Sequence, residues 1–212
     1  MSVADIRTEY KKQSLNKADI LSNAFEQFTK WWNEALQSEL DEVNAMTLAT
    51  VAPEGTPAAR IVLLKGFDER GFVFYTNYNS NKGKQIDNSG KAALLFFWAP
   101  LERQIRITGT ITKVSEEESD AYFNSRPVGS KIGAWASPQS LPIFDRSVIE
   151  DNEKKYQAEY TDENIPRPPH WGGYIVQPFE IEFWQGRPSR LHDRFLYTLQ
   201  EGGSWKIERL AP

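Results

Sequence analysis

The chain has 212 residues, with 25 Lys or Arg against 29 Asp or Glu, so its formal charge at neutral pH is −4. It has no cysteine and only two histidines, which excludes a disulfide scaffold, a thiolate metal site and a cysteine nucleophile, and we expect no metal. Interspersed charges of both signs are not typical of a nucleic-acid-binding protein, so no nucleic-acid partner is expected and any anion site must be local.

The length fits one domain. Residues 1–17 are polar and lack apolar periodicity, so we expect a mobile N-terminal arm ahead of a single domain over residues 18–212. The longest nearly apolar run, residues 91–100, is too short to span a membrane. The chain does not begin with a signal-peptide pattern, which predicts a cytoplasmic protein without membrane contact.

The first predicted element is an amphipathic helix. Asn23 followed by Glu26 is typical of a helix start. Apolar residues recur there at three- and four-residue steps, as on one helix face: Leu21, Phe25, Phe28, Trp32 and Leu36.

Short extended runs separated by turn residues follow, which predicts antiparallel strands. The first three should form a meander that the next two continue: residues 45–52, 58–65, 71–77, 91–98 and 102–114. Helices are expected at 80–88, from Ser115 to before Pro127, and near 147–160. Four further strands are expected at 173–176, 179–185, 194–199 and 205–210. Seven to nine short strands with flanking helices favour a closed or split antiparallel barrel.

Several polar residues could form sites. If residues 190–194 are extended, Arg190, His192 and Arg194 share one face, which suits either a site or an ordinary exposed strand face. Arg60 and Lys65 flank four apolar residues, as strand ends or as anion ligands, and their spacing points them to opposite faces.

Tyr122, Arg126 and Ser130 are spaced four apart, and Ser130 could cap a following helix whose amides favour an anion. Lys82 and Lys84 follow Ser80 near a predicted helix start, where they could bind a phosphate or simply be solvated. Gln104 shares a strand face with Arg106, and Gln139-Ser140 lies in a loop, where side-chain amides could meet the edge of a heteroaromatic ring.

No Walker A, Rossmann, zincin or nucleophile-elbow motif occurs in the sequence. Cations in phosphate-sized sets, ring-edge amides and seven Trp favour a phosphorylated aromatic cofactor that carries the chemistry.

Taken together, these segments closely resemble the pyridoxine (pyridoxamine) 5′-phosphate oxidase family. Residues 181–194 match the family signature at every defined position. The similarity also covers residues 60–65, 74–77, 101–104, 132–135 and 193–212.

The resemblance implies a mainly β fold with flanking helices, an antiparallel, Greek-key-like FMN-binding split barrel. It also implies a homodimer with FMN at the interface. The implied reaction oxidises pyridoxine 5′-phosphate or pyridoxamine 5′-phosphate to pyridoxal 5′-phosphate. A hydride passes from substrate C4′ to flavin N5, and O₂ is reduced to H₂O₂.

The resemblance further assigns roles to residues of this chain. Arg190 and His192 would be catalytic. The residues that would bind FMN are Arg60, Ile61, Val62, Leu63, Leu64, Lys65, Tyr75, Thr76, Lys82, Gln104, Gln139, Ser140, Trp184 and Arg194. Those that would bind substrate are Lys65, Tyr122, Arg126, Ser130, Arg190, Leu191, His192, Arg7 and Tyr10.

One position departs from the family pattern: many members have Arg directly before Lys82, and this chain has Asn81. Two rival functions remain at this point. One is a split-barrel module that holds flavin or pyridoxal phosphate without turnover, and the other is a flavin reductase that uses a nicotinamide donor.

Overall fold

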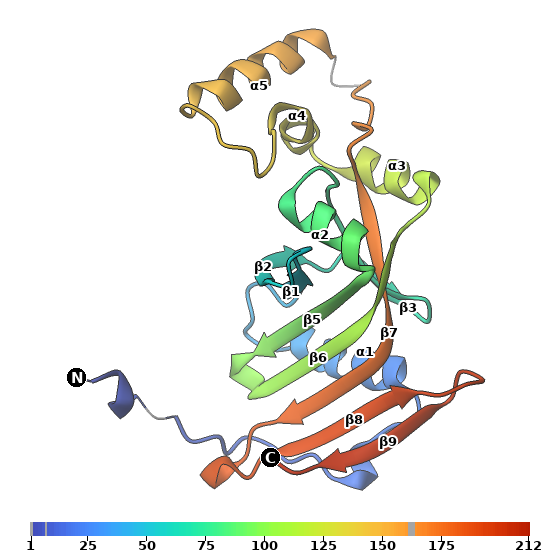
Figure 1. Ribbon diagram of the computed structural model, residues 1–212. Helices are drawn as coiled ribbons and strands as arrows, with labels where there is room; N and C mark the ends of the chain where they lie inside the picture. The colour runs from blue at the N-terminus through green and yellow to red at the C-terminus, as the bar shows by residue number, and fades with distance from the viewer. Residues whose placement is uncertain (1, 7, 161–163) are drawn as a thin grey trace.

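A computed structural model of the chain describes residues 2–6, 8–160 and 164–212. Within these ranges, nine strands form one sheet in which every pairing is antiparallel, in the order β2-β1-β5-β6-β7-β4-β3 (Figure 1). β8 pairs with β7 and β9, and the outer strands β2 and β3 do not pair with each other. The fold is therefore an open antiparallel sheet with flanking helices, which confirms the predicted class. Among the described residues, no helix is long and apolar enough to cross a membrane.

The strands are β1 (Ala45–Val51), β2 (Pro57–Leu63), β3 (Gly66–Asp68), β4 (Gly71–Asn77), β5 (Lys91–Trp98), β6 (Arg103–Lys113), β7 (Trp171–Gln185), β8 (Asp193–Leu199) and β9 (Trp205–Leu210). The α-helices are α1 (Ala24–Leu36), α2 (Asn81–Ser89), α3 (Glu116–Ser125), α4 (Val128–Ala136) and α5 (Ser147–Glu159). The short 3-10 helices are η1 (Val3–Asp5), η2 (Lys17–Asp19), η3 (Ala99–Leu101) and η4 (Pro188–Arg190).

β7 is the longest strand and pairs with three others, β4 near its start, β8 near its end and β6 along most of its length. The register with β6 shifts between Thr108 and Gly109, opposite Pro178. A Cβ at Gly109 would lie 2.2 Å from the carbonyl oxygen of Gln177, so the bulge needs glycine. The sequence predicts two strands here. The structure has one, because the strand continues through the bulge while its second partner changes from β4 to β8.

The predicted meander of the first three strands is wrong. β1 and β2 form a hairpin, but β4 pairs with β3 and β7. The change of partner occurs between two neighbouring residues: Leu64 N–H donates to Asn44 O, whereas Lys65 N–H donates to Val73 O on β4. β5 accordingly pairs with β1 and continues the sheet on that side.

α1 begins as predicted, because the Asn23 side chain accepts hydrogen bonds from the N–H groups of Phe25 and Glu26. Its buried face is rotated from the predicted one, since Trp31 is buried and Leu36 is exposed. Phe28 lies at the centre of the core, with its ring centroid 4.8–5.5 Å from those of three neighbours: Phe67, Phe72 and Phe96.

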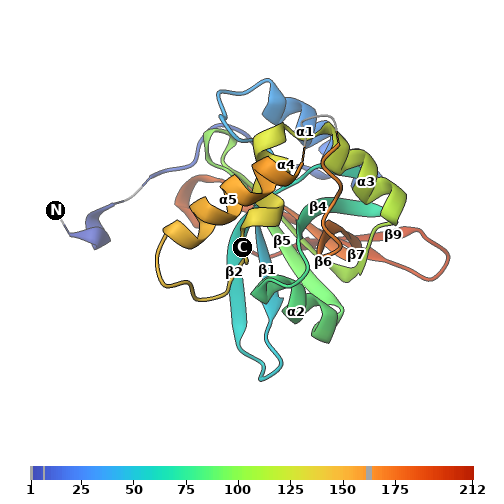
Figure 2. The ribbon, with the colours of Figure 1, turned by 90° about the horizontal axis from the view of Figure 1, so that it is seen from above.

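α3, α4 and α5 gather at one end of the molecule, and the β8–β9 hairpin lies at the opposite end (Figure 1). Seen from the helical end, α4 and α5 lie in front of the strands (Figure 2). A second buried cluster joins α3 and α4 to the start of β7 and the residues before it: Phe123, Ile132, Ile165 and Trp171. The helices therefore form a cap beside the first residues of β7.

Candidate functional site

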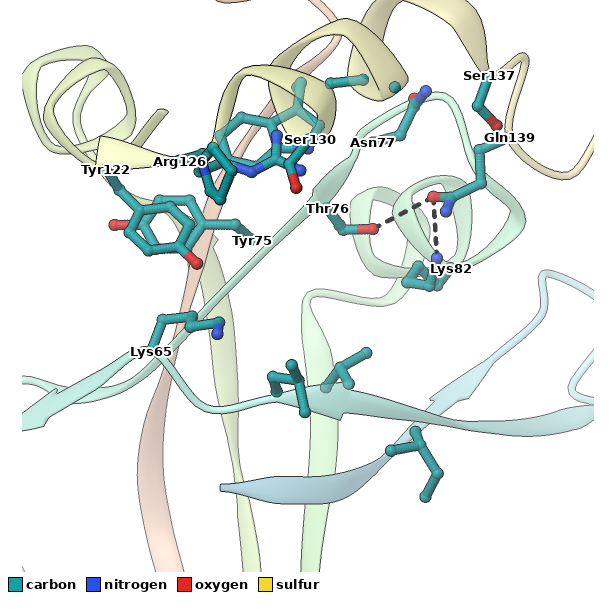
Figure 3. A pocket seen from close by; sticks show the side chains of 17 residues that line it. Lys65, Tyr75, Thr76, Asn77, Lys82, Tyr122, Arg126, Ser130, Ser137 and Gln139 are labelled. Atoms are coloured by element: carbon teal, nitrogen blue, oxygen red, sulfur yellow. Dashed lines mark hydrogen bonds between the residues drawn. The ribbon is translucent and has the colours of Figure 1, made fainter. Parts of the chain in front are cut away.

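A cavity of about 640 Å³ lies between the ends of β2 and β4, the start of α2 and the α3–α4 corner (Figure 3). Its size is typical of sites for small ligands. It brings together eleven of the residues singled out from the sequence: Ile61, Val62, Leu63, Lys65, Tyr75, Thr76, Lys82, Tyr122, Arg126, Ser130 and Gln139.

Lys65 reaches this cavity because it stands where the chain leaves β2 and turns toward β3. Its backbone is held by Val73 on β4, and its side chain is exposed toward the cavity (Figure 3). The predicted strand would have ended at Lys65, but β2 ends at Leu63. The prediction that Arg60 and Lys65 point to opposite faces of one strand therefore does not apply, because Lys65 lies beyond the end of β2.

Arg126 is a half-buried cation in the cavity wall. It ends α3 in an extended conformation, as expected before Pro127, and its guanidinium carbon lies 4.6 Å from the centroid of the Trp171 ring. Burial lowers the pKa of Arg126. Its Nη1 is buried and has no hydrogen-bond partner among the described residues. A buried donor on a cation is costly unless water or a ligand pairs with it, so this atom is a candidate donor to an anion.

Aromatic rings form a flat stack beside Arg126. The ring centroids of Tyr75 and Tyr122 are 3.9 Å apart, and that of Trp171 lies 5.5 Å from Tyr75, with all three planes within 18°. Gly173 permits this, since a Cβ there would lie 2.8 Å from the Tyr75 ring. Within the stack, the Trp171 ring supports the guanidinium by a cation–π contact, while Nη1 keeps no hydrogen-bond partner among the described residues.

Lys82 lies on the opposite side of the cavity, in the first turn of α2. Ser80 caps that helix, accepting a hydrogen bond from Gly83 N–H at 3.4 Å. Lys82 Nζ donates to Gln139 Oε1 at 3.1 Å, and Thr76 Oγ1 donates to the same oxygen at 3.4 Å (Figure 3). Burial, together with the charge of Arg60, lowers the pKa of Lys82.

The Arg60 side chain lies near Lys82 but does not line the cavity. Its guanidinium donates to Leu48 O at 3.1 Å, to Thr50 Oγ1 at 2.6 Å and to Gln85 Oε1 at 3.1 Å. Burial lowers the pKa of Arg60. All three partners are neutral, so its positive charge is not balanced by these bonds.

The cavity is locally cationic although the chain is acidic. The residues that line it include three cations, Lys65, Lys82 and Arg126, and no carboxylate among those described. None of these three, nor Arg60, belongs to an ion pair within residues 2–6, 8–160 and 164–212. Uncompensated cations around a pocket favour phosphate-bearing ligands.

Four further predicted site residues form a second group, which we call the Trp184 cluster: Gln104, Trp184, His192 and Arg194. Trp184 on β7 is in register with Gln104 on β6 and with Arg194 on β8, so these three share one face of the sheet. The ring centroids of Trp184 and His192 are 4.5 Å apart. No residue of this cluster lines the cavity described above.

Arg194 is paired within the chain. Its Nε and Nη2 donate to the two oxygens of Glu182 at 2.8 and 3.1 Å, and the same carboxylate accepts from Arg106 at 3.1 Å. The hydrogen bond to Glu182 raises the pKa of Arg194. The bidentate pair orients the guanidinium.

His192 is held by the turn before it. Its Nδ1 accepts the N–H of Arg187 at 3.1 Å, which leaves Nε2 as the protonated nitrogen of the neutral ring. Burial and the charge of Arg190 lower the pKa of His192, and Asp193 opposes them. The ring is therefore biased toward its neutral form.

The prediction that Arg190, His192 and Arg194 share a strand face is wrong. Arg190 lies in η4, where Ser189 and Arg190 have φ values of 56° and 62°, and β8 begins only at Asp193. Pro188 and the two positive φ values turn the chain, so strand alternation does not reach Arg190.

Other predicted residues lie elsewhere. Leu64 is buried in the core, and Ser140, with φ of 72°, is exposed beside Gln139. Leu191 is 69% exposed in the turn after Arg190. Arg7 lies outside the described residues.

Ser130 lines the cavity but does not cap α4. The helix begins at Val128, with Pro127 at its cap position, because Pro127 already has the φ of a helix start. Lys84 and Asn81 are exposed and do not line the cavity.

Sequence reasoning missed Trp171, which supports Arg126, and Glu182, which holds Arg194. Glu182 lies inside the family signature segment, and that position could have marked it as a site residue. Nothing local in the sequence places Trp171 beside Arg126, since the two are brought together by the sheet.

Comparisons with known proteins agree with this geometry. Residues 32–159 match the family model described as Pyridoxamine 5′-phosphate oxidase, and residues 171–212 match Pyridoxine 5′-phosphate oxidase C-terminal dimerisation region. Pyridoxine/pyridoxamine 5′-phosphate oxidase 1 of Ralstonia nicotianae is 58% identical over 211 residues, covering 100% of this chain and 99% of that protein. The Burkholderia mallei pyridoxine/pyridoxamine 5′-phosphate oxidase is 59% identical over 213 residues, with the same coverage.

Solved structures share the fold. PhzG from Burkholderia lata, in complex with tetrahydrophenazine-1-carboxylic acid, is 29% identical with a TM-score of 0.88, covering 97% of this chain and all of that one. A pyridoxamine 5′-phosphate oxidase-related, FMN binding protein from Nostoc punctiforme is 20% identical with a TM-score of 0.72, covering 90% and 98%, and shows the fold alone. The full-length identity to the two named oxidases confirms the resemblance: this chain is an enzyme of the pyridoxine/pyridoxamine 5′-phosphate oxidase family.

Proposed function

We propose that the enzyme uses FMN and O₂ to oxidise pyridoxine 5′-phosphate or pyridoxamine 5′-phosphate to pyridoxal 5′-phosphate, with release of H₂O₂. The observation that carries this proposal is the cavity lined by Lys65, Lys82 and Arg126, which have no ion-pair partner among the described residues. Two phosphate groups, one on the cofactor and one on the substrate, would balance these charges. The relatives named as oxidases of these substrates support the substrate class.

The residues present fit FMN. Lys82 and the neighbouring Arg60 would hold its phosphate at the start of α2, where the helix amides also favour an anion. On one side Ile61, Val62, Leu63 and Lys65, and on the other Tyr75 with Thr76, would line the ring and the chain that joins it to the phosphate. Gln139 and Ser140 would meet the same ligand from the α4–α5 loop.

The substrate phosphate would lie on the other side of the cavity. Lys65, Tyr122, Arg126 and Ser130 line that part, and the buried Nη1 of Arg126 is free to donate to it (Figure 3). The first turn of α4 adds backbone amides beside Ser130. In this arrangement Lys82 would bind the FMN phosphate and Arg126 the substrate phosphate.

The Trp184 cluster would complete the site in a homodimer. It does not line the cavity of its own chain, yet it holds a His192 biased toward its neutral form, an oriented Arg194 and an indole ring. All three lie in residues 171–212, which match a family segment described as a dimerisation region. Trp184, Arg194 and Gln104 of the partner subunit would then meet FMN bound in the cavity.

Bound FMN would supply the redox chemistry, taking a hydride from substrate C4′ at flavin N5 and passing the electrons to O₂. The residues of the chain position the substrate against the cofactor. The phosphate clamp converts binding energy into alignment of the pyridine ring, while Arg190 and the Nε2–H of His192 hold the ring substituents. Leu191 and Tyr10 would close the apolar side of the site.

Aerobic mixing of FMN-loaded protein with pyridoxine 5′-phosphate tests the proposal. We expect aldehyde absorbance and O₂ consumption in equal amounts, and Arg126→Ala should raise KM by roughly 30-fold or more, the cost of a lost charge-assisted phosphate contact. A binding module would form no aldehyde, and a flavin reductase would need a nicotinamide donor. Either result, or an unchanged KM in Arg126→Ala, would contradict the proposal.

A further inference from the structure

Residues 10–15, which we call the strap, lie against the body of the protein. Lys12 N–H donates to Glu102 Oε2 at 2.9 Å, and Leu15 N–H donates to Asp193 Oδ2 at 3.0 Å. Leu15 is 3% exposed and belongs to the main core. The mobility expected of residues 1–17 stays a prediction, but this part of the segment has defined partners.

Arg103 lies beneath the middle of the strap. Its side chain is 5% exposed and stacks on Trp31, with its guanidinium carbon 4.4 Å from the ring centroid. Its nitrogens donate to three different elements: Nη2 to Gln13 on the strap, Nη1 to Glu34 on α1 and Nε to Gln185 at the end of β7. Because the guanidinium is planar and rigid, these bonds fix the three elements relative to one another.

Gln185 extends the network to the backbone directly before β6. Its Nε2 donates to the carbonyl oxygens of Leu101 and Glu102, both at 3.2 Å. Gly186 N–H donates to Glu102 O at 2.7 Å. The strap and the start of the turn are thus held by one buried set of groups.

Tyr10, at the beginning of the strap, packs on the Trp184 cluster. Its ring centroid lies 5.7 Å from that of Trp184 and 6.0 Å from that of His192, edge-on in both cases. Gly186 makes room for it, since a Cβ there would lie 2.7 Å from Tyr10 Cγ. The position of Tyr10 therefore depends on how the residues directly after it are anchored.

We propose that Arg103 is a positioning residue, which through Gln13 latches the strap and so holds the Tyr10 ring against Trp184 and His192. Arg103 touches none of these three rings in the contacts above and acts through the strap. The inference rests on the proposed function only where it assigns Tyr10 and His192 to the substrate site. The latch itself is a property of the folded chain.

Gln13→Ala is the sharpest test, because it removes the acceptor on the strap and leaves Arg103 paired with Glu34 and Gln185. Hydrogen exchange in the FMN-loaded protein reports the latch directly, since Lys12 and Leu15 N–H both donate to the body. We expect both amides to exchange about tenfold faster in Gln13→Ala. Gln13→Glu keeps the acceptor and should restore protection.

Ser14→Ala is the matched control on the same segment, because its hydroxyl accepts only from Asn16 among the described residues. It should leave exchange at Lys12 and Leu15 unchanged. Equal exchange in Gln13→Ala and Ser14→Ala would overturn the latch.

Kinetics separate positioning from general stability. Gln13→Ala and Tyr10→Ala should each raise KM for pyridoxine 5′-phosphate, and the double variant should do no more than Tyr10→Ala alone, because both act through one ring. Independent, multiplying effects would overturn the positioning role. An inactive wild type with protected Lys12 and Leu15 amides would instead contradict the proposed function and leave the latch standing.

Discussion

The cavity and the Trp184 cluster are built in opposite ways. The cavity presents cations that no carboxylate of the described chain balances, and one of them, Arg126, has a buried unpaired donor. In the cluster the main charge is already satisfied, because both carboxylate oxygens of Glu182 accept hydrogen bonds from Arg194, and His192 is biased toward neutrality. The first region is made to bind anions from outside the chain, and the second to present rings and donors in fixed orientations.

The largest expected effect comes from combining one defect from each region. Arg126→Ala damages the cavity and His192→Ala damages the cluster, so each homodimer should be nearly inactive at substrate concentrations well below the wild-type KM. If each site joins the cavity of one subunit to the cluster of the other, a heterodimer of the two variants contains one undamaged site. Random reassembly of equal amounts should then restore about a quarter of wild-type activity, since half the dimers are mixed and each has one good site of two.

Activity is measured after unfolding and refolding the two variants together, with each refolded alone as the control. Recovery no greater than the sum of the separate variants would mean that both regions serve one site within a subunit. That result would contradict a site shared between two subunits.

A smaller effect is expected within the cavity, between two lysines on the same helix. Lys82 points into the cavity, whereas Lys84 is exposed and does not line it. Lys82→Ala should weaken FMN binding by roughly 10- to 100-fold through the lost charge-assisted contact, while Lys84→Ala should stay within about twofold. Flavin fluorescence titration measures both. Similar losses in the two variants would show that general surface charge, and not placement, attracts the cofactor.

The smallest expected effect is a pH dependence of that affinity. Burial and the charge of Arg60 hold the pKa of Lys82 below its ordinary value of 10.5. On the proposed function Lys82 would bind the FMN phosphate as a cation, so FMN affinity should fall as pH rises through this lowered pKa, by at most about tenfold per pH unit. Lys82→Arg stays charged and should remove that part of the slope, as seen by repeating the titration at several pH values. An identical slope in both proteins would assign the dependence to another group.

Local features of the fold were predictable because their causes are adjacent in sequence. Asn23 starts α1 by accepting from residues two and three positions ahead, and Ser115 does the same for α3 through Glu118 N–H. β9 is found where the alternating run predicts it. Resemblance to the family supplied most of the cavity residues, and the structure brings eleven of them together.

Long-range features were not predictable from patterns of this kind. β4 could pair with any neighbouring strand on periodicity alone, and its pairing with β7 depends on a segment about a hundred residues away. The turn at Arg190 was missed because residues 190–194 alternate as a strand does, whereas Pro188 and two positive φ values decide the backbone. Trp171 and Glu182 act only through partners that the sheet brings to them.

β7 has a consequence for what a single chain can do. Trp171 at its start supports the cavity, and Trp184 near its end belongs to the cluster, thirteen residues and up to about 43 Å further along an extended strand. A strand keeps its ends apart, so under the proposed function one subunit would hold two half-sites that cannot meet within the same chain. On the proposed dimer, catalytic competence is then a property of the assembly: dilution into monomers would abolish it without unfolding a single chain.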